Sequence, residues 1–169
     1  MADVVIRAAQ AHDIPRLYEI SCAAHRMSYD DLIPRLYRRK FIARFTSTPA
    51  GLAKRRALYA DKLDNPAWII LVAEQAGHVA GYIQAVMNRR NVKIAGLFID
   101  PQSQGQGIGA RLLEHLLSGL PTGATVRLSV LQGNDRAIHL YERFGFILKG
   151  YDIRRFYGAR QRRMMLMVT

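Results

Sequence analysis

The sequence predicts a single-domain α/β protein in which helices flank one mixed, mostly antiparallel sheet. The chain has 169 residues, about the length of one domain. Half of its residues are hydrophobic and 22% are charged, which is typical of a soluble globular protein with a real core. Its apolar patterns give the order β-α-α-α-β-β-β-α-β-α-β-β, without repeats or low-complexity linkers.

The chain begins with a strand followed by a helix. Residues 4–7 are mostly β-branched and predict the strand. Asp13 is placed to cap the helix, and Pro15 fits its first turn.

Two more helices are expected before the next strand. One begins near Asp30 or Asp31, with Pro34 in its first turn. Thr48 and Pro49 are typical of the N-cap and first residue of the other, which runs to about residue 63. The apolar face of the earlier helix is expected to contain Ile33, Leu36, Tyr37 and Phe41.

The remaining elements alternate between apolar strands and amphipathic helices. The turn at residues 75–78 joins two apolar runs into a hairpin. The last two strands are expected to pair. The expected strands are 68–74, 79–87, 93–99, 125–131, 146–150 and 164–168, and the expected helices are 108–118 and 135–144.

The most informative segment is a loop between a strand and a helix in which Gly105, Gly107 and Gly109 alternate with other residues. Such a loop can direct successive backbone N–H groups into one concavity, and the following helix N-terminus adds partial positive charge. A loop that only turns the chain would not need three alternating glycines. The pattern therefore predicts a phosphate-binding loop.

A dinucleotide-binding loop is one alternative, because Gly105-x-Gly107-x-x-Ala110 fits that fingerprint. The fingerprint also requires an acidic residue about 20 positions further on. The segment 127–131 has none, and the loop follows a hairpin. We therefore rank this interpretation low.

A second interpretation fits better. Gln104-x-x-Gly107-x-Gly109 resembles the coenzyme A signature of the GCN5-related N-acetyltransferase (GNAT) superfamily, and the preceding segment 98–101 resembles the end of the strand before it. Segment 134–137, together with Tyr141 and the Phe-Gly-Phe of residues 144–146, resembles the second signature of that family. The order of elements matches along nearly the whole chain.

The resemblance implies direct acetyl transfer from acetyl-CoA to an amine. The five histidines show no metal-ligand spacing, so we expect no metal. It implies that strands 93–99 and 125–131 splay into a V beside a bulge, and that a backbone N–H of the first strand polarises the thioester carbonyl. Tyr141 would protonate the departing thiolate, and Asn134 would bind the cofactor arm, with a helix cap as its alternative role. The residues implied to bind the cofactor are Leu97, Phe98, Ile99, Gln104, Gly105, Gln106, Gly107, Ile108, Gly109, Ala110, Asn134, Ala137 and Tyr141.

The sequence does not single out a general base for the acceptor amine. Strand 93–99 has no acid, and Ser129 lies in the middle of the opposite arm. Deprotonation through water is also open. The candidate side chains are Tyr29, Asp30, Asp31, Glu74 and Tyr157.

The net charge of +12 is concentrated in two segments. Residues 32–60 hold eight basic side chains and residues 153–163 hold five, and neither segment contains an acid. By resemblance these segments lie on the acceptor side, which suggests an anionic acceptor, although solvated helix faces and coenzyme A phosphates are alternatives. The expected acceptor-side residues are Tyr29, Ser129, Arg154, Arg155 and Tyr157.

Other features restrict the compartment and the partners. Cys22 is the only cysteine, so neither an intrachain disulfide nor a cysteine zinc site can form. No apolar run approaches 18 residues and no signal sequence is recognised, so we expect a cytoplasmic protein with no membrane partner. The expected partner is a small-molecule or peptide amine, and a homodimer is compatible with the sequence. A noncatalytic acetyl-CoA-binding module and, third, a nucleic-acid-binding protein are the alternatives.

Overall fold

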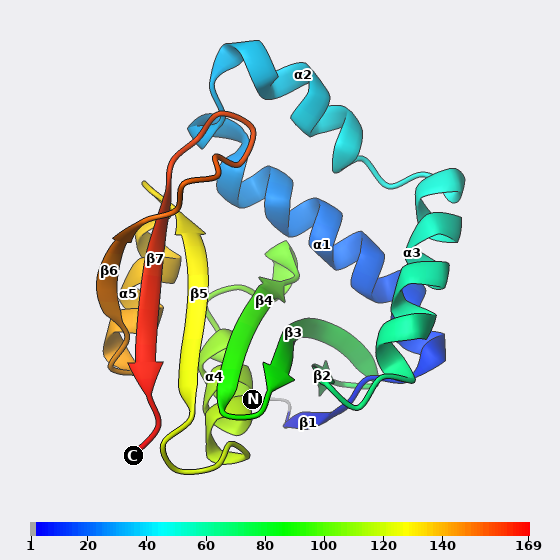
Figure 1. Ribbon diagram of the computed structural model, residues 1–169. Helices are drawn as coiled ribbons and strands as arrows, with labels where there is room; N and C mark the ends of the chain where they lie inside the picture. The colour runs from blue at the N-terminus through cyan, green and yellow to red at the C-terminus, as the bar shows by residue number, and fades with distance from the viewer. Residues whose placement is uncertain (1–2) are drawn as a thin grey trace.

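The computed structural model describes residues 3–169 as one seven-stranded sheet flanked by helices (Figure 1). The strand order is β1-β2-β3-β4-β5-β7-β6, and every neighbouring pair is antiparallel except β4 and β5. The predicted fold class, including the pairing of the last two strands, is confirmed. The strands are β1 Val4–Ala8, β2 Trp68–Gln75, β3 His78–Asn88, β4 Asn91–Ile99, β5 Thr125–Leu131, β6 Ile147–Tyr151 and β7 Gln161–Met167.

Helices cover the two faces of the sheet unequally. The helices are α1 Ile14–Tyr29, α2 Arg35–Arg44, α3 Pro49–Leu63, α4 Ile108–Ser118 and α5 Asp135–Arg143. Helices α4 and α5 pack on one face through leucines and isoleucines, and α1 and α3 pack against β2 and β3 on the other. Figure 1 shows that β5, β7 and β6 carry no helix over most of the face that α1 and α3 share. This half of the sheet is therefore open on one side.

The two parallel strands separate part of the way along their length. Pairing between β4 and β5 begins at Asn91–Thr125 and stops at Lys93–Arg127. A bulge in the β3–β4 ladder pairs Gln84 with Gly96 and its neighbour Ala85 with Ile94, so β4 carries one extra residue there. The bulge bends β4 away from β5, which opens the expected V and leaves one edge of β4 without a strand partner.

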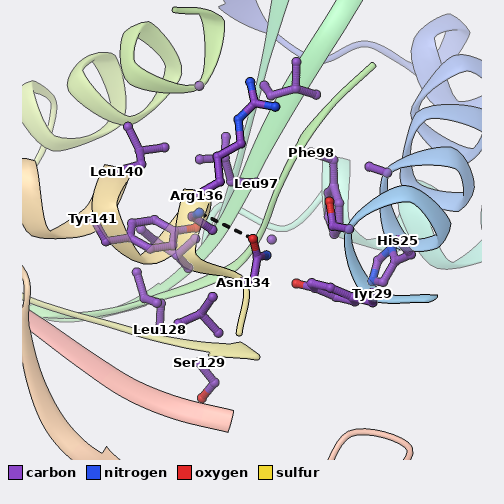
Figure 2. Close-up of a pocket in the computed structure, with 18 of the residues that line it drawn as sticks. His25, Tyr29, Leu97, Phe98, Leu128, Ser129, Asn134, Arg136, Leu140 and Tyr141 are labelled. Atoms are coloured by element: carbon purple, nitrogen blue, oxygen red, sulfur yellow. Dashed lines mark hydrogen bonds between the residues drawn. The ribbon is translucent and has the colours of Figure 1, made fainter. Parts of the chain in front are cut away.

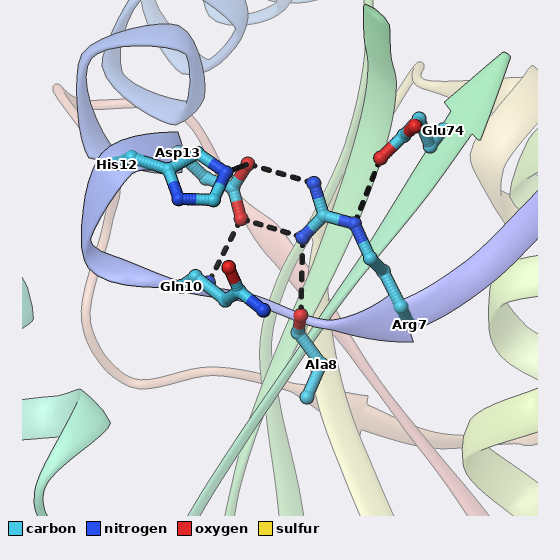
Figure 3. Close-up of polar contacts among 6 residues, drawn as sticks. All are labelled: Arg7, Ala8, Gln10, His12, Asp13 and Glu74. Carbon is cyan, nitrogen blue, oxygen red and sulfur yellow. Dashed lines mark hydrogen bonds and ion pairs between the residues drawn. The ribbon is translucent and has the colours of Figure 1, made fainter. Parts of the chain in front are cut away.

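The predicted capping role of Asp13 is wrong. This carboxylate makes no capping bond to α1. It is 4% exposed and accepts hydrogen bonds from both terminal nitrogens of Arg7, at 2.8 and 2.9 Å, and from the Gln10 N–H (Figure 3). Arg7 Nε also donates to Glu74 at 2.8 Å, so these side chains join β1 and β2 to the start of α1.

The second helix also differs from its prediction. Residues 30–32 form a separate 3-10 turn, and Pro34 is the N-cap of α2 and does not lie in its first turn. Ile33 and Phe41 are buried as expected, but Leu36 is 82% exposed. Leu36 lies five positions before Phe41 in α2, so it points about 140° away from that buried side chain and faces the surface. Strands β4 and β7 begin two and three residues earlier than expected, because backbone pairing continues under polar side chains.

Candidate active site

A pocket of about 800 Å³ occupies the V between β4 and β5 (Figure 2). Its walls come from β4, β5, the glycine loop with the start of α4, α5, and the C-terminal end of α1. It lies where the parallel strands separate, so the open edge of β4 faces directly into it. Such an edge can accept an extended ligand as an added strand.

The glycine loop is built to receive a bulky anion at one end of this pocket. Gly105 and Gly107 have φ of +84° and +76°, a conformation that favours glycine. A Cβ added at either residue would meet no nearby group within 4 Å, so the space beside the loop is open. The first N–H groups of α4 have no intrahelical partners and carry partial positive charge. The loop therefore offers N–H donors to a pyrophosphate.

Side chains around this loop show which predicted cofactor residues reach the pocket. Arg136, at the start of α5, donates to the side chain of Gln104, and both line the pocket. Gln106 does not line it, because its amide accepts a hydrogen bond from Gln75 at 2.9 Å. The other expected residues line the pocket: Leu97, Phe98, Ile99, Gly105, Gly107, Ile108, Gly109, Ala110, Asn134, Ala137 and Tyr141.

Tyr141 forms part of the pocket wall. The side chain is 6% exposed, and its ring packs edge-on against Phe146 at 5.5 Å between centroids. Burial raises the pKa of Tyr141, and the nearby Tyr29 raises it further. The phenol therefore keeps its proton at neutral pH and is available as a hydrogen-bond donor in the pocket.

Asn134 caps α5, the helix that carries Tyr141, and Tyr29 is the last residue of α1. The Asn134 side-chain oxygen accepts from the Ala137 N–H at 3.4 Å, so the helix-cap role considered for this residue is confirmed. Burial raises the pKa of Tyr29, and a hydrogen bond with Asn134 opposes this effect. In Figure 2 the hydroxyl of Tyr29 points towards Asn134.

An acidic residue that the sequence analysis missed also lines the pocket. Ser129, on β5, donates to the Asp152 carboxylate at 2.8 Å. This bond lowers the pKa of Asp152 against the opposing effect of burial, and the Arg154 N–H, Arg163 and Lys93 lower it further. Among the described residues, Asp152 is the only carboxylate that lines the pocket. No local sequence pattern marks this residue, because Ser129 and Asp152 are 23 positions apart in the chain.

An aromatic wall completes the acceptor side. His25 lies 4.0 Å from Phe45 in a stacked arrangement and 4.8 Å from Phe98, measured between ring centroids, and Phe156 is also close. Its Nδ1 donates to the Ser21 carbonyl at 2.6 Å, so a neutral ring leaves Nε2 as an acceptor. Burial lowers the pKa of His25 to about 4.

Only part of the expected acceptor side reaches the pocket. Tyr29, Ser129 and Arg154 line it. Arg155 does not line it and donates to the Gly158 carbonyl at 3.3 Å. Tyr157 packs against Phe41, with 5.6 Å between centroids, also away from the pocket. We expected residues 32–60 and 153–163 to face the acceptor, but Arg154 is the only basic residue of these two segments that lines the pocket.

The carboxylates considered as general bases lie elsewhere. Glu74 is held by Arg7 and does not line the pocket. Asp30 and Asp31 pair with Arg38 at 3.6 and 3.2 Å, outside the lining. Of the five named candidates, only Tyr29 remains at the site.

Comparison with known proteins points to one family. The model of the acetyltransferase (GNAT) family matches residues 14–146. A mouse thialysine N-epsilon-acetyltransferase is 34% identical over 105 residues, which cover 53% of this chain and 62% of that enzyme. This chain therefore matches less than two thirds of the length of that relative.

Solved structures share the fold. The ribosomal-protein-S18-alanine N-acetyltransferase of Escherichia coli superposes with a TM-score of 0.73 at 22% identity, covering 99% of this chain and 95% of that one. YncA of Salmonella typhimurium, solved with its cofactor acetyl-CoA, gives a TM-score of 0.69 at 21% identity and covers 99% and 95% of the two chains. Over residues 3–169, no helix is long and apolar enough to cross a membrane.

Proposed function

This chain belongs to the acetyltransferase (GNAT) family, and we propose that it transfers an acetyl group from acetyl-CoA directly to a primary amine. The observation that carries the proposal is the single pocket wall that combines three parts. A glycine loop offers N–H donors, the β4 edge is unpaired, and the protonated Tyr141 of α5 lines the same pocket.

Binding of the donor substrate would use backbone more than side chains. The loop from Gly105 to Ala110 would hold the pyrophosphate, and Arg136 would add a cation beside it. The β4 segment 97–99 would pair with the pantetheine arm as an added strand, and the side-chain amide of Asn134 would face that arm. This arrangement would place the thioester in the V, next to Tyr141.

The transfer itself needs a general acid and a hydrogen-bond donor to the thioester carbonyl oxygen. The amine nitrogen forms a bond to the thioester carbonyl carbon, and the carbon–sulfur bond then breaks. A backbone N–H of β4 would stabilise the negative charge on the carbonyl oxygen. The phenol of Tyr141 would give its proton to the departing thiolate, for which its buried, protonated state is suited.

The acceptor amine would meet Asp152. Its low pKa, set mainly by the bond from Ser129, keeps this carboxylate ionised at neutral pH, so it can attract an ammonium group into the pocket. Water in the open pocket would carry away the proton that the amine loses. Tyr29 and the aromatic wall would enclose the carbon chain next to the amine.

A thiol-release assay with acetyl-CoA and a panel of small and peptide amines tests the proposal. Tyr141→Phe is expected to lower kcat by about 100-fold or more, as for a lost general acid. Tyr157→Phe, outside the pocket, is the matched control and should keep the rate. Coenzyme A binding without thiol release for any amine would instead indicate a noncatalytic binding module.

A further inference from the structure

The open face of the sheet holds a second hollow, most of whose lining the proposed reaction does not use. This groove has a volume of about 580 Å³ and lies on β3, β4, β5, β7 and β6. Strand register places its side chains together, because Lys93 pairs with Arg127 and Ser129 pairs with Arg163. The alternate residues Val126 and Val130 of β5 do not line the groove and are buried.

The groove carries four exposed cations, Lys93, Arg127, Lys149 and Arg163, which we call the cationic groove. Within residues 3–169, none of them lies within 4.0 Å of a carboxylate. Arg127 donates to the Asn91 side chain at 3.3 Å, and Arg163 donates to the Lys149 carbonyl at 3.4 Å. Asp152 is the one acid of the lining and accepts from Ser129. Bound carboxylates would relieve the repulsion among these cations.

The cationic groove continues directly from the proposed active site. Lys93, Leu128, Ser129 and Asp152 line both hollows. A molecule whose amine reaches Asp152 can therefore extend from it along the open face of the sheet.

The spread of the cations decides what kind of acceptor fits. They lie on four adjacent strands, β4, β5, β7 and β6, and neighbouring strands are about 4.8 Å apart, so they span roughly 14 Å. One carboxylate cannot bridge that width, whereas an extended acidic peptide carries several. A second copy of this chain is a poor occupant, because each copy has a net charge of +12. Building on the proposed function, we propose that the acceptor is a polypeptide whose reactive amine is followed by acidic residues that bind in the cationic groove.

Paired peptides test this inference. One peptide carries four Asp or Glu residues next to the reactive amine, and its partner carries Asn or Gln at those positions. Each peptide is made in two versions, one with an α-amine and one with a lysine ε-amine as the reactive group. One exposed ion pair strengthens binding by a factor of up to about five. With several such pairs, we expect kcat/KM at low salt to be about tenfold higher for the acidic peptide than for its neutral partner. The ratio should decrease as salt is added. Thiol release with a ratio of one or less overturns the inference but not the proposed function, whereas no release from any amine overturns both.

Two variants of equal charge locate the effect. Arg127→Gln combined with Lys149→Gln should lower the ratio at least threefold. Arg39→Gln combined with Arg56→Gln, on the exposed surfaces of α2 and α3, should leave it unchanged. Equal effects of the two double variants would overturn the inference. Stronger inhibition by a single-stranded oligonucleotide than by the acidic peptide would also overturn it. The same holds if sedimentation shows a dimer that the Arg127→Gln and Lys149→Gln double variant dissociates and the Arg39→Gln and Arg56→Gln double variant does not.

Discussion

Replacing Gly107 by alanine separates the cofactor role of the glycine loop from its backbone role. Gly107 has φ of +76°, at the N-cap of α4. Gly77, in the β2–β3 turn outside the pocket, has φ of +77°. No nearby group lies within 4 Å of a Cβ added at either position. The two substitutions therefore impose the same backbone strain, but only one of them places a methyl group in the proposed pyrophosphate site.

The expected magnitudes follow from this match. A left-handed alanine costs about 1–2 kcal/mol, so both variants should lose that free energy of unfolding. In the loop, the methyl group would also displace the ligand from charge-assisted hydrogen bonds worth about 1.5–3 kcal/mol. This loss corresponds to an increase of roughly 10- to 150-fold in the Kd of coenzyme A.

Urea unfolding measures the first quantity, and titration calorimetry with coenzyme A measures the second. Gly77→Ala should bind coenzyme A like the parent protein, while Gly107→Ala binds at least tenfold more weakly. Equal Kd values for the two variants would show that this loop does not hold the pyrophosphate.

Two further predictions concern stability. Burial and the charges of Arg55 and Arg44 lower the pKa of His25 to about 4, although its hydrogen bond to Ser21 opposes them. In the unfolded chain this histidine has a pKa of about 6.5, so as the pH falls the unfolded state binds the proton before the native state does. Native stability should therefore decrease by about 2 kcal/mol more in the parent than in His25→Phe between pH 7 and pH 5, and equal losses in urea unfolding would disprove this role. Arg7→Met leaves the buried Asp13 carboxylate unpaired and should cost about 3–5 kcal/mol. Glu74→Gln, at the partly exposed end of the network, should cost less than about 1 kcal/mol, and a similar cost for both would contradict the account of Figure 3.

The sequence predicted the fold well because its signals are local. The leucines of 108–118 repeat at helical spacing, and the apolar runs on either side of the turn at 75–78 specify a hairpin. Most residues expected to bind the cofactor line the pocket because one short loop and one strand end carry them. Leu36 was misplaced because it was grouped with Ile33, which lies before α2, whereas within the helix Leu36 points about 140° away from the buried Phe41.

The acceptor side was harder to predict because tertiary structure assembles it. Asp152 meets Ser129 across 23 positions, and no local pattern marks that contact. The cations of the groove come from four separate strands. Only Arg163 has a basic neighbour in the sequence, Arg162, so no basic run marks the groove. The dense basic run of 35–40 drew attention to α2, whose cations do not line the pocket. Total charge in a segment does not indicate the direction in which its side chains point.

Direct acetyl transfer to an amine is the central claim, and the stoichiometry of the products tests it most directly. Incubation with isotope-labelled acetyl-CoA and the acidic peptide should yield one labelled acetyl-amine, detected by mass spectrometry, for each free thiol of coenzyme A. Free thiol without the acetylated amine, or neither product above the rate without protein, would contradict the claim.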